Sequence, residues 1–301
     1  MAVGGPETSD GNMLRSGLFA ASAAAFFAAM NLCVKASSAS GGPDLPALEV
    51  TFFRYLFGLL TASPMLFIFG RSILRTSQAG AHMIRILAGA SGVMLMFAAL
   101  ANLPVGLVTS IGFSSPFFTL IFAGLVLGER VGRWRWLAVL VGFFGVMIMT
   151  GAPTGAIEPA IGLAVMAAVF LGIEVGVIRL LVQRDHFATI LLINNGAALI
   201  LLSVPAWFVW VTPDPGQVIL LAGVGISVVL GQILFLAAMK IGEASFVAPF
   251  NYLTLVFAMV FGFLLFAEVP SATTLAGATL IVLAGLFLLH RENIQRRKPS
   301  D

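Results

Sequence analysis

A single acidic residue, Glu174, lies deep within a long apolar segment of the chain. The segment covers residues 159–182, and Glu174 sits about two-thirds of the way along it, in AAVFLGIEVGVIRLL. An ionisable group inside a bilayer costs about 2.5–3.5 kcal/mol on insertion scales, so such a residue is a candidate for function. We expect Glu174 to face a cavity and to bind a cationic or amine group of a substrate, or a coupled proton. The alternative is a carboxyl group hydrogen-bonded between two helices.

Basic residues in the apolar segments could bind a negatively charged group of a substrate. Arg54 lies roughly two helical turns inside the segment at 48–69 and could attract an anionic group such as a carboxylate or a phosphate. The alternative is that Arg54 pairs with Glu49 or Asp44, or extends its guanidinium to the lipid headgroups. Lys35, at the end of its apolar segment, is expected to be a boundary residue.

Uncharged polar and aromatic residues complete the candidate site. Ser114, Asn251 and Tyr252 lie near Pro116 and Pro249, and a proline kinks a helix and frees a carbonyl that can line a cavity. Aromatic side chains could stack on a flat ring or a sulfonium. The alternative is packing for the aromatic residues and a hydrogen bond between helices for the polar ones. The candidate substrate-binding residues are Glu174, Asn31, Ser114, Phe113, Phe117, Asn251, Tyr252, Gln232 and Arg54.

The composition places these residues in a membrane protein. The 301 residues are 59% hydrophobic and 10% charged, whereas soluble domains carry about 25% charged residues. The chain has no Walker motif and no HExxH, its three histidines lie at the ends of apolar segments, and Cys33 is its single cysteine. We therefore expect no catalytic residue, no metal, no cofactor and no ATP hydrolysis. The basic residues lie in short loops, which argues against a nucleic-acid partner.

Ten apolar segments are long enough to cross a bilayer as helices. At about 1.5 Å of rise per residue, roughly 20 helical residues span a hydrocarbon core of about 30 Å. A polar tail at 1–14 precedes the segments, and a basic tail at 291–301 follows them. The segments cover 15–37, 48–69, 80–101, 104–128, 132–151, 159–182, 187–211, 216–239, 243–267 and 271–290.

The stretch from Pro104 to Met149 is repeated later in the chain. It matches EASFVAPFNYLTLVFAMVFGFLLFAE, so that Val108 falls on Val247 and Glu129 on Glu268. The two glutamates mark the repeat best, because charge is scarce in this chain. We predict two five-helix repeats around a central cavity, and because five is odd the second repeat enters the membrane inverted. The repeats cover residues 15–151 and 159–290.

The distribution of Lys and Arg predicts the orientation in the membrane. Fourteen of the 16 basic residues lie on one side of the membrane if the N-terminus is cytoplasmic, as the positive-inside rule favours. Both termini are then cytoplasmic, and the chain lies in the cell inner membrane. The fourteen are Arg15, Arg71, Arg75, Arg85, Arg130, Arg133, Arg135, Arg179, Arg184, Lys240, Arg291, Arg296, Arg297 and Lys298.

Three segments carry a resemblance to a known family. ALEVTFFRYLFG, LPVGLVTSIGFSSPFFTLIFAGLVLGERV and EASFVAPFNYLTLVFAMVFGFLLFAEVP resemble the drug/metabolite transporter (DMT) superfamily in its ten-span EamA-repeat form. The FFRY, FSSPFFTL and APFNYL stretches look most like the branch of bacterial S-adenosylmethionine uptake carriers, and riboflavin importers look related. Small multidrug members of the superfamily carry a glutamate midway along their first span. This chain has Asn31 as its deep polar residue there, so a proton-coupled drug exporter of that type is not expected.

The residues and the resemblance together predict a secondary active transporter that moves a small polar metabolite by alternating access. The resemblance implies S-adenosylmethionine or a similar cofactor-like solute. The alternatives are a riboflavin importer and an exporter of amino acids or other metabolites; a channel and an intramembrane enzyme are the alternatives from other classes. The expected partners are the substrate, the lipid bilayer, and a coupled proton or an exchanged solute. The protein is expected to be a monomer or a homodimer, and its substrate, direction and coupling stay open.

Overall fold

The computed structural model describes residues 9–100, 103, 108, 111–150, 159–267 and 269–297. Within these residues every regular element is a helix, as predicted for an all-α membrane protein. The elements are α1 (Ser9–Ala39), α2 (Ala47–Ala62), α3 (Pro64–Phe69), the 3₁₀ helix η1 (Arg71–Leu74), α4 (Ala79–Leu100), α6 (Ser115–Leu125), α7 (Arg133–Thr150), α8 (Pro159–Arg184), α9 (Phe187–Phe208), α10 (Pro215–Ile241), α11 (Ala244–Val247), the 3₁₀ helix η2 (Ala248–Tyr252), α12 (Leu253–Phe266) and α13 (Ala272–Arg297).

Eight helical segments of the described chain are long and apolar enough to cross a membrane, so this is a multi-pass membrane protein. The other two expected segments are not among the eight. The segment at 104–128 begins outside the described residues and continues as the 11-residue helix α6, and the segment at 132–151 is α7. The count of ten therefore stays a prediction. The eight are Asn12–Ala39, Ala47–Phe69, Ala79–Met96, Pro159–Arg184, Phe187–Phe208, Pro215–Ile241, Ala244–Phe266 and Ala272–Arg291.

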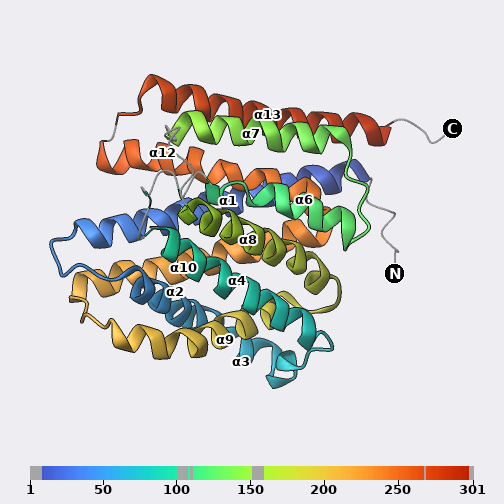
Figure 1. Ribbon diagram of the computed structural model, residues 1–301. Helices are drawn as coiled ribbons and strands as arrows, with labels where there is room; N and C mark the ends of the chain where they lie inside the picture. The colour runs from blue at the N-terminus through green and yellow to red at the C-terminus, as the bar shows by residue number, and fades with distance from the viewer. Residues whose placement is uncertain are drawn as a thin grey trace.

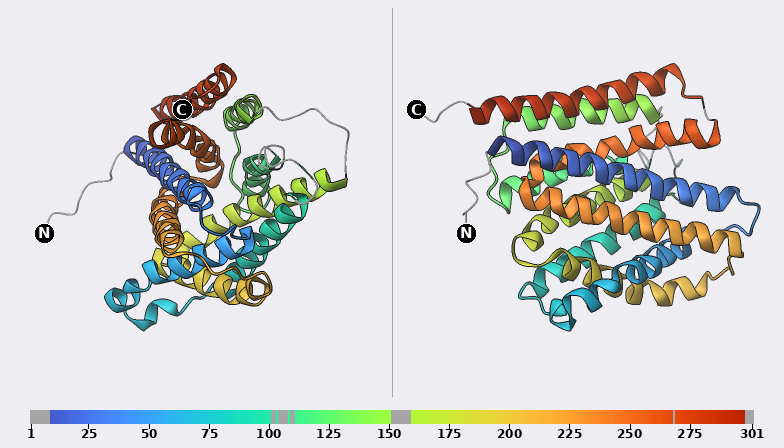
Figure 2. Two further views of the ribbon diagram at one scale, coloured as in Figure 1. Left: turned by 90° about the vertical axis from the view of Figure 1, so that its left-hand side faces the viewer. Right: turned by 180° about the vertical axis from the view of Figure 1, so that it is seen from behind.

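The long helices lie side by side in one bundle, with α7 and α13 along one side and α2 and α9 along the opposite side (Figures 1 and 2). The first residues of α1 and the last residues of α13 lie at the same end of this bundle (Figure 1). A hydrogen bond of 3.0 Å from Ser16 Oγ to the Ala238 carbonyl places the end of α10 there as well. We call this end of the bundle the Ser16 end.

The most extensive helix contacts join the first part of the chain to the second. α1 packs on α10, α4 on α8, and α7 on α13. Small residues allow the last pair to approach closely, because a Cβ added at Gly145 would lie 2.8 Å from the Gly277 carbonyl oxygen.

Two prolines expected to kink helices lie where a helical segment breaks and where a helix begins. The segment Ala244–Phe266 breaks into α11, η2 and α12, and Pro249 lies in the 3₁₀ turn. Pro116 lies in the first turn of α6, where its missing N–H leaves no helical hydrogen bond unmade. The break at Pro249 brings Asn251 into an irregular stretch of backbone within the membrane, a feature tolerated where the chain lines a cavity.

The helices at both ends of the chain are longer than the apolar segments. α1 begins at Ser9, inside the tail expected at 1–14, and α13 continues to Arg297, inside the tail expected at 291–301. The second extension has a simple cause, because Arg, Glu and Gln in RENIQRR are good helix formers. Hydropathy finds only the part of a helix that lies in lipid, so it places these boundaries too far inward.

Candidate functional site

A cavity of about 180 Å³ lies where α1, α2, α4, α8, α10 and η2 meet. Its polar side chains come from five of these elements, and each element contributes one. Its apolar wall includes Phe27 of α1 and Phe235 of α10. We call this space the central cavity; its polar residues are Arg54, Arg85, Glu174, Gln232 and Asn251.

Glu174 and Arg85 face each other across the central cavity. The distance from Arg85 Nε to Glu174 Oε1 is 3.8 Å, which is an ion pair without a direct hydrogen bond. Arg85 is 1% exposed, and its Nε and Nη1 atoms have no hydrogen-bond partner within the described part of the chain. Glu174 is more open, with 24% of its side chain exposed. The absence of a side chain at Gly89 makes room for it, since a Cβ there would lie 3.2 Å from the Glu174 carboxyl carbon.

Arg54 brings a second positive charge to the central cavity. Its guanidinium lies 5.0 Å from the centre of the Tyr55 ring, and its Nε is buried without a hydrogen-bond partner among the described residues. The ion pair with Glu49 or Asp44, which was the alternative expected from the sequence, is not among the contacts of the described chain. Glu49 instead accepts a hydrogen bond of 3.0 Å from the backbone N–H of Val211. Arg54 is thus available to the cavity.

Four of the nine candidate residues meet in the central cavity, although they lie far apart in the sequence. Glu174 and Arg54 are charged, and the amides of Gln232 and Asn251 join them. The Gln232 Oε1 atom is buried and lacks a hydrogen-bond partner in the part of the chain that the structure describes. A cavity that combines two guanidinium groups, a carboxylate and two amides can bind a small, strongly polar solute.

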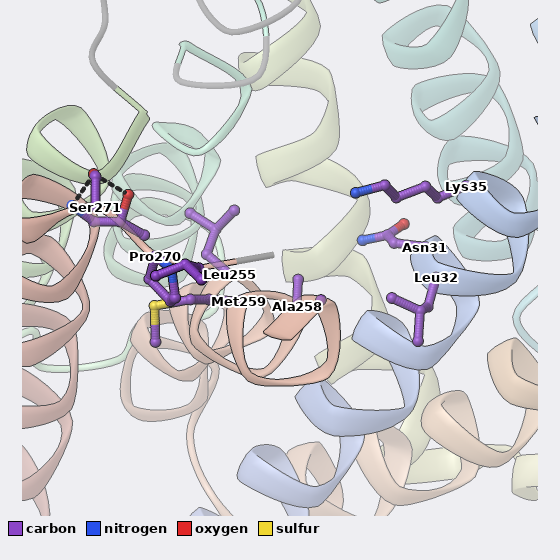
Figure 3. A pocket seen from close by; sticks show the side chains of 11 residues that line it. Asn31, Leu32, Lys35, Leu255, Ala258, Met259, Pro270 and Ser271 are labelled. Atoms are coloured by element: carbon purple, nitrogen blue, oxygen red, sulfur yellow. Dashed lines mark hydrogen bonds between the residues drawn. The ribbon is translucent and has the colours of Figure 1, made fainter. Parts of the chain in front are cut away.

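Asn31 lines a second cavity, of about 570 Å³. Because Asn31 lies about four turns beyond Ser16 on α1, this cavity is nearer the opposite end of the bundle. Asn31 and Lys35 project from α1 toward α12 and the segment at Pro270 and Ser271 (Figure 3). We call this space the outer cavity. The Lys35 ammonium lies 5.1 Å from the centre of the Phe266 ring.

The two cavities lie along the same faces of two helices. Phe27, Asn31 and Lys35 follow one another at four-residue spacing on α1, so they form one stripe. Asn251 of η2 lines the central cavity, and Leu255, near the start of α12, lines the outer cavity. The central cavity and the outer cavity are therefore consecutive along the bundle axis.

The remaining four candidates, Ser114, Phe113, Phe117 and Tyr252, do not line either cavity as far as the described residues show. Tyr252 is 1% exposed and packs with Val146 of α7 and Ile281 of α13. Phe113 lies 6.3 Å from Tyr252, and Phe117 lies 5.3 Å from Phe143, between ring centres. Ser114 precedes α6 as its N-cap residue, without a side-chain capping bond. Within the described chain these aromatic side chains pack against other rings and apolar residues, and their part in substrate binding stays a prediction.

Sequence reasoning missed Arg85, which it assigned to a cytoplasmic helix end. The structure corrects this assignment, because Arg85 is buried at the central cavity rather than solvated. One signal was present: Arg85 lies five residues inside the apolar segment at 80–101 and is its only Lys or Arg. Among the described residues, no group of His, Cys, Asp or Glu could hold a metal ion.

A second polar cluster, also missed, ties the two parts of the chain together at the Ser16 end. Glu129, in the loop before α7, accepts hydrogen bonds from the backbone N–H groups of Ala244 (2.9 Å) and Ser245 (3.1 Å) and from Ser245 Oγ (2.7 Å). Arg179 of α8 lies 3.7 Å from the same carboxylate. Glu129 therefore caps α11, which is the start of the broken helix. We call this set, together with Arg135 and Glu243, the Glu129 cluster.

Two arginines reinforce the Glu129 cluster. Arg135 pairs with Glu243 and donates a hydrogen bond of 2.6 Å to Ser245 Oγ. Arg179, which the sequence placed among the basic residues of the cytoplasmic side, donates to the carbonyl oxygens of Met239 and Lys240 at the end of α10. The sequence repeat singled out Glu129 and Glu268 as its markers. Glu268 lies outside the described residues.

The family of the chain follows from comparison with known proteins. The model of the EamA-like transporter family matches residues 15–151 and again residues 158–290. The chain belongs to this family. It is thus a transporter of the DMT superfamily, as its sequence segments indicate.

Named relatives of this chain are transporters of different solutes. It is 30% identical over 252 residues to an S-adenosylmethionine uptake transporter of Rickettsia prowazekii, covering 83% of this chain and 85% of the relative. It is 32% identical over 295 residues to a riboflavin transporter of Vibrio cholerae, covering 96% and 97%. It is also 32% identical over 284 residues to the pseudopaline exporter CntI of Pseudomonas aeruginosa, covering 92% and 97%.

A solved structure shares the fold. A crystal structure with 17% sequence identity superposes with a TM-score of 0.78 and covers 92% of this chain and 98% of its own. At this identity the likeness concerns the fold alone.

Proposed function

We propose that this protein is a secondary active transporter that carries a small polar metabolite across the bacterial inner membrane by alternating access. One observation carries the proposal: the central cavity gathers Arg54, Arg85, Glu174, Gln232 and Asn251 from both parts of the chain. Charged groups inside a membrane are expensive and mark substrate or ion pathways. We assign substrate binding to this cavity and keep Glu174 as the candidate for proton coupling.

The proposed architecture is two inverted five-helix repeats, 15–151 and 159–290, with both termini in the cytoplasm. The location of the α1 start and the α13 end at the same end of the bundle supports this orientation (Figure 1). The bias of Lys and Arg toward that side supports it further. The cytoplasmic side is then the Ser16 end.

In this orientation we interpret the arrangement as an outward-facing state, because the side chains that link the two parts of the chain lie at the cytoplasmic end. The Glu129 cluster joins the two parts of the chain at the cytoplasmic end. The larger of the two consecutive cavities, about 570 Å³, lies toward the outside. Alternating access requires this asymmetry to reverse, with the Glu129 cluster broken and the outer cavity closed.

The proposed substrate is S-adenosylmethionine or a similar cofactor-like solute, taken up from outside. Relatives named as S-adenosylmethionine uptake transporters support this choice. The similar identity to a riboflavin transporter and to a pseudopaline exporter keeps riboflavin import and metabolite export as the second candidates. A carrier can run in either direction, because the imposed gradients decide the net flux.

Counterflow in proteoliposomes tests the proposal. Purified protein is reconstituted with an excess of unlabelled S-adenosylmethionine inside, and entry of labelled S-adenosylmethionine is followed, with riboflavin and a mixed amino-acid pool in parallel. A transient overshoot with one of these solutes supports a carrier and identifies its substrate class. A linear, unsaturable influx without overshoot contradicts alternating access and indicates a channel.

A further inference from the structure

We propose that Arg54 and Arg85 form a carboxylate-binding subsite, and that Glu174 binds the ammonium group of the same solute. The substrates are then solutes with a zwitterionic, amino-acid-like head group. This inference rests on the proposed function and deepens it, because it states which chemical group the central cavity selects.

The charges of the central cavity do not balance. Its lining contains two guanidinium groups and one carboxylate, so these side chains carry a net positive charge. The ion pair of Arg85 with Glu174 is 3.8 Å long and leaves the Nε and Nη1 atoms of Arg85 without hydrogen bonds to the described residues. The Arg54 Nε atom likewise has no hydrogen-bond partner among the described residues. The site therefore lacks one negative charge and several hydrogen-bond acceptors.

The missing group has the properties of a carboxylate. A guanidinium presents a planar fork of donors that matches a carboxylate with two parallel hydrogen bonds. A buried charge without a partner is costly inside a membrane, so binding of an anion removes an existing penalty. In a zwitterionic head group the carboxylate pairs locally with the two guanidinium groups, and the ammonium group pairs with Glu174. Inorganic phosphate has no cationic group with which Glu174 could pair.

Glu174 supplies the complementary half of the subsite. Its carboxylate is 24% exposed, and Gly89 leaves it free to lie against α4. An ammonium group next to the bound carboxylate would meet the exposed part of the Glu174 carboxylate. The amide of Gln232, whose Oε1 has no partner among the described residues, offers a further acceptor for the N–H groups.

The sizes of the two cavities fit this arrangement. Pockets for drug-sized ligands have volumes of about 300–1,000 Å³, and the central cavity at about 180 Å³ is smaller. It holds a head group rather than a whole nucleoside. The remainder of a larger solute then extends past Phe27 toward the outer cavity of about 570 Å³.

The test compares ligands that differ only in the α-carboxylate. Binding to purified full-length protein is measured by the rise in melting temperature for two pairs: S-adenosylmethionine and its decarboxylated form, and L-methionine and 3-methylthiopropylamine. Inorganic phosphate and acetate are run alongside as simple anions. At least one carboxylate-bearing member should stabilise the protein, while its partner should not.

Variants then assign the effect to the two arginines. R54Q and R85Q should each weaken binding of the stabilising ligand by roughly 30-fold or more, the cost of losing a buried charge partner. R75Q, at an exposed arginine that does not line the cavity, is the matched control and should bind normally. R85K keeps the positive charge without the planar pair of guanidinium donors, so it should lose part of the affinity for the carboxylate-bearing ligand. R85K also replaces R85Q in this test if R85Q does not fold.

The outcomes separate this inference from the proposed function. Equal stabilisation by both members of every pair, no stabilisation by any carboxylate, or stronger stabilisation by phosphate would each overturn the inference. Counterflow of S-adenosylmethionine and its decarboxylated form at equal rates would overturn it while transport stands. Arginine-dependent binding of a carboxylate, with no counterflow of that solute, would support the subsite and contradict the transport proposal.

Discussion

The guanidinium of Arg85 and the carboxylate of Glu174 lie 3.8 Å apart, from Nε to Oε1, in the interior of a membrane protein. The pair joins α4 to α8, which are among the most closely packed helices of the bundle. At this distance the charges attract each other but share no direct hydrogen bond. A ligand group or a proton can therefore alter the pair without first breaking a closed bidentate contact.

Neutralising Glu174 tests this relationship. E174Q leaves two guanidinium groups without their acid, and we expect a loss of stability of about 1–3 kcal/mol together with at least a tenfold drop in counterflow. The double variant R85Q/E174Q should be more stable than the sum of the single effects predicts, because the two charges are coupled. Melting temperature and counterflow are the measurements. D44N, at an exposed acid, is the control, and unchanged transport and pH dependence in E174Q would exclude a role for Glu174.

Gly89 provides a more selective test of the same carboxylate. A Cβ in G89A would lie 3.2 Å from the Glu174 carboxyl carbon, so the carboxylate must shift by a few tenths of an ångström. We expect a several-fold weaker affinity for an amine-bearing ligand, with little loss of stability, because Ala favours the helix by up to about 1 kcal/mol over Gly. Isothermal titration and thermal melting measure the two effects.

G80A is the matched control for G89A. Gly80 lies on the same helix, and a Cβ there meets nothing within 4 Å among the described residues. It should change neither affinity nor transport. Equal losses of affinity in both variants would show that the helix backbone, and not the position of Glu174, is responsible.

The close contact of α7 and α13 through small residues leads to a prediction about stability alone. A Cβ in G145A would lie 2.8 Å from the Gly277 carbonyl oxygen, a backbone atom that cannot move aside easily. We expect G145A to lower the melting temperature by an amount that corresponds to about 1–3 kcal/mol. G285A adds a methyl group to α13 with nothing within 4 Å in the described chain and should be neutral. A neutral G145A would mean that the two helices are not in close contact in the membrane.

Much of the fold was predictable because lipid imposes a simple pattern. A helix that crosses the bilayer must be apolar for about 20 residues, so hydropathy locates α1, α8 and α10 directly. Because polar residues are scarce in these segments, Glu174, Arg54, Gln232 and Asn251 also stand out by residue type alone. The extension of α13 to Arg297 lies beyond the apolar segment, where hydropathy carries no information.

The features that could not be predicted depend on helix rotation and on contacts between distant residues. Tyr252 and Asn251 are neighbours in η2, yet Asn251 lines the cavity and Tyr252 packs against α7. Apolar segments without a clear polar face do not fix this rotation. Arg85 was missed because its position near a segment end fits a solvated residue equally well, until packing of α4 against α8 buries it. The partners of Glu129 lie more than a hundred residues away, at Ala244 and Ser245.

The Glu129 cluster leads to a prediction about conformational state that depends on the proposed orientation. E129Q and R179Q weaken the capping of α11 and the link between the two parts of the chain, so the outward-facing state should lose population. The readout is labelling of N31C, in the outer cavity, by an impermeant thiol reagent applied from outside, in a C33A background that removes the single native cysteine. We expect several-fold slower labelling in both variants and an unchanged rate in R130Q, an exposed arginine in the same loop. Unchanged labelling in all three variants would mean that the cluster stabilises the fold without controlling access. A group of residues controls access only if it stabilises one of the two conformational states more than the other.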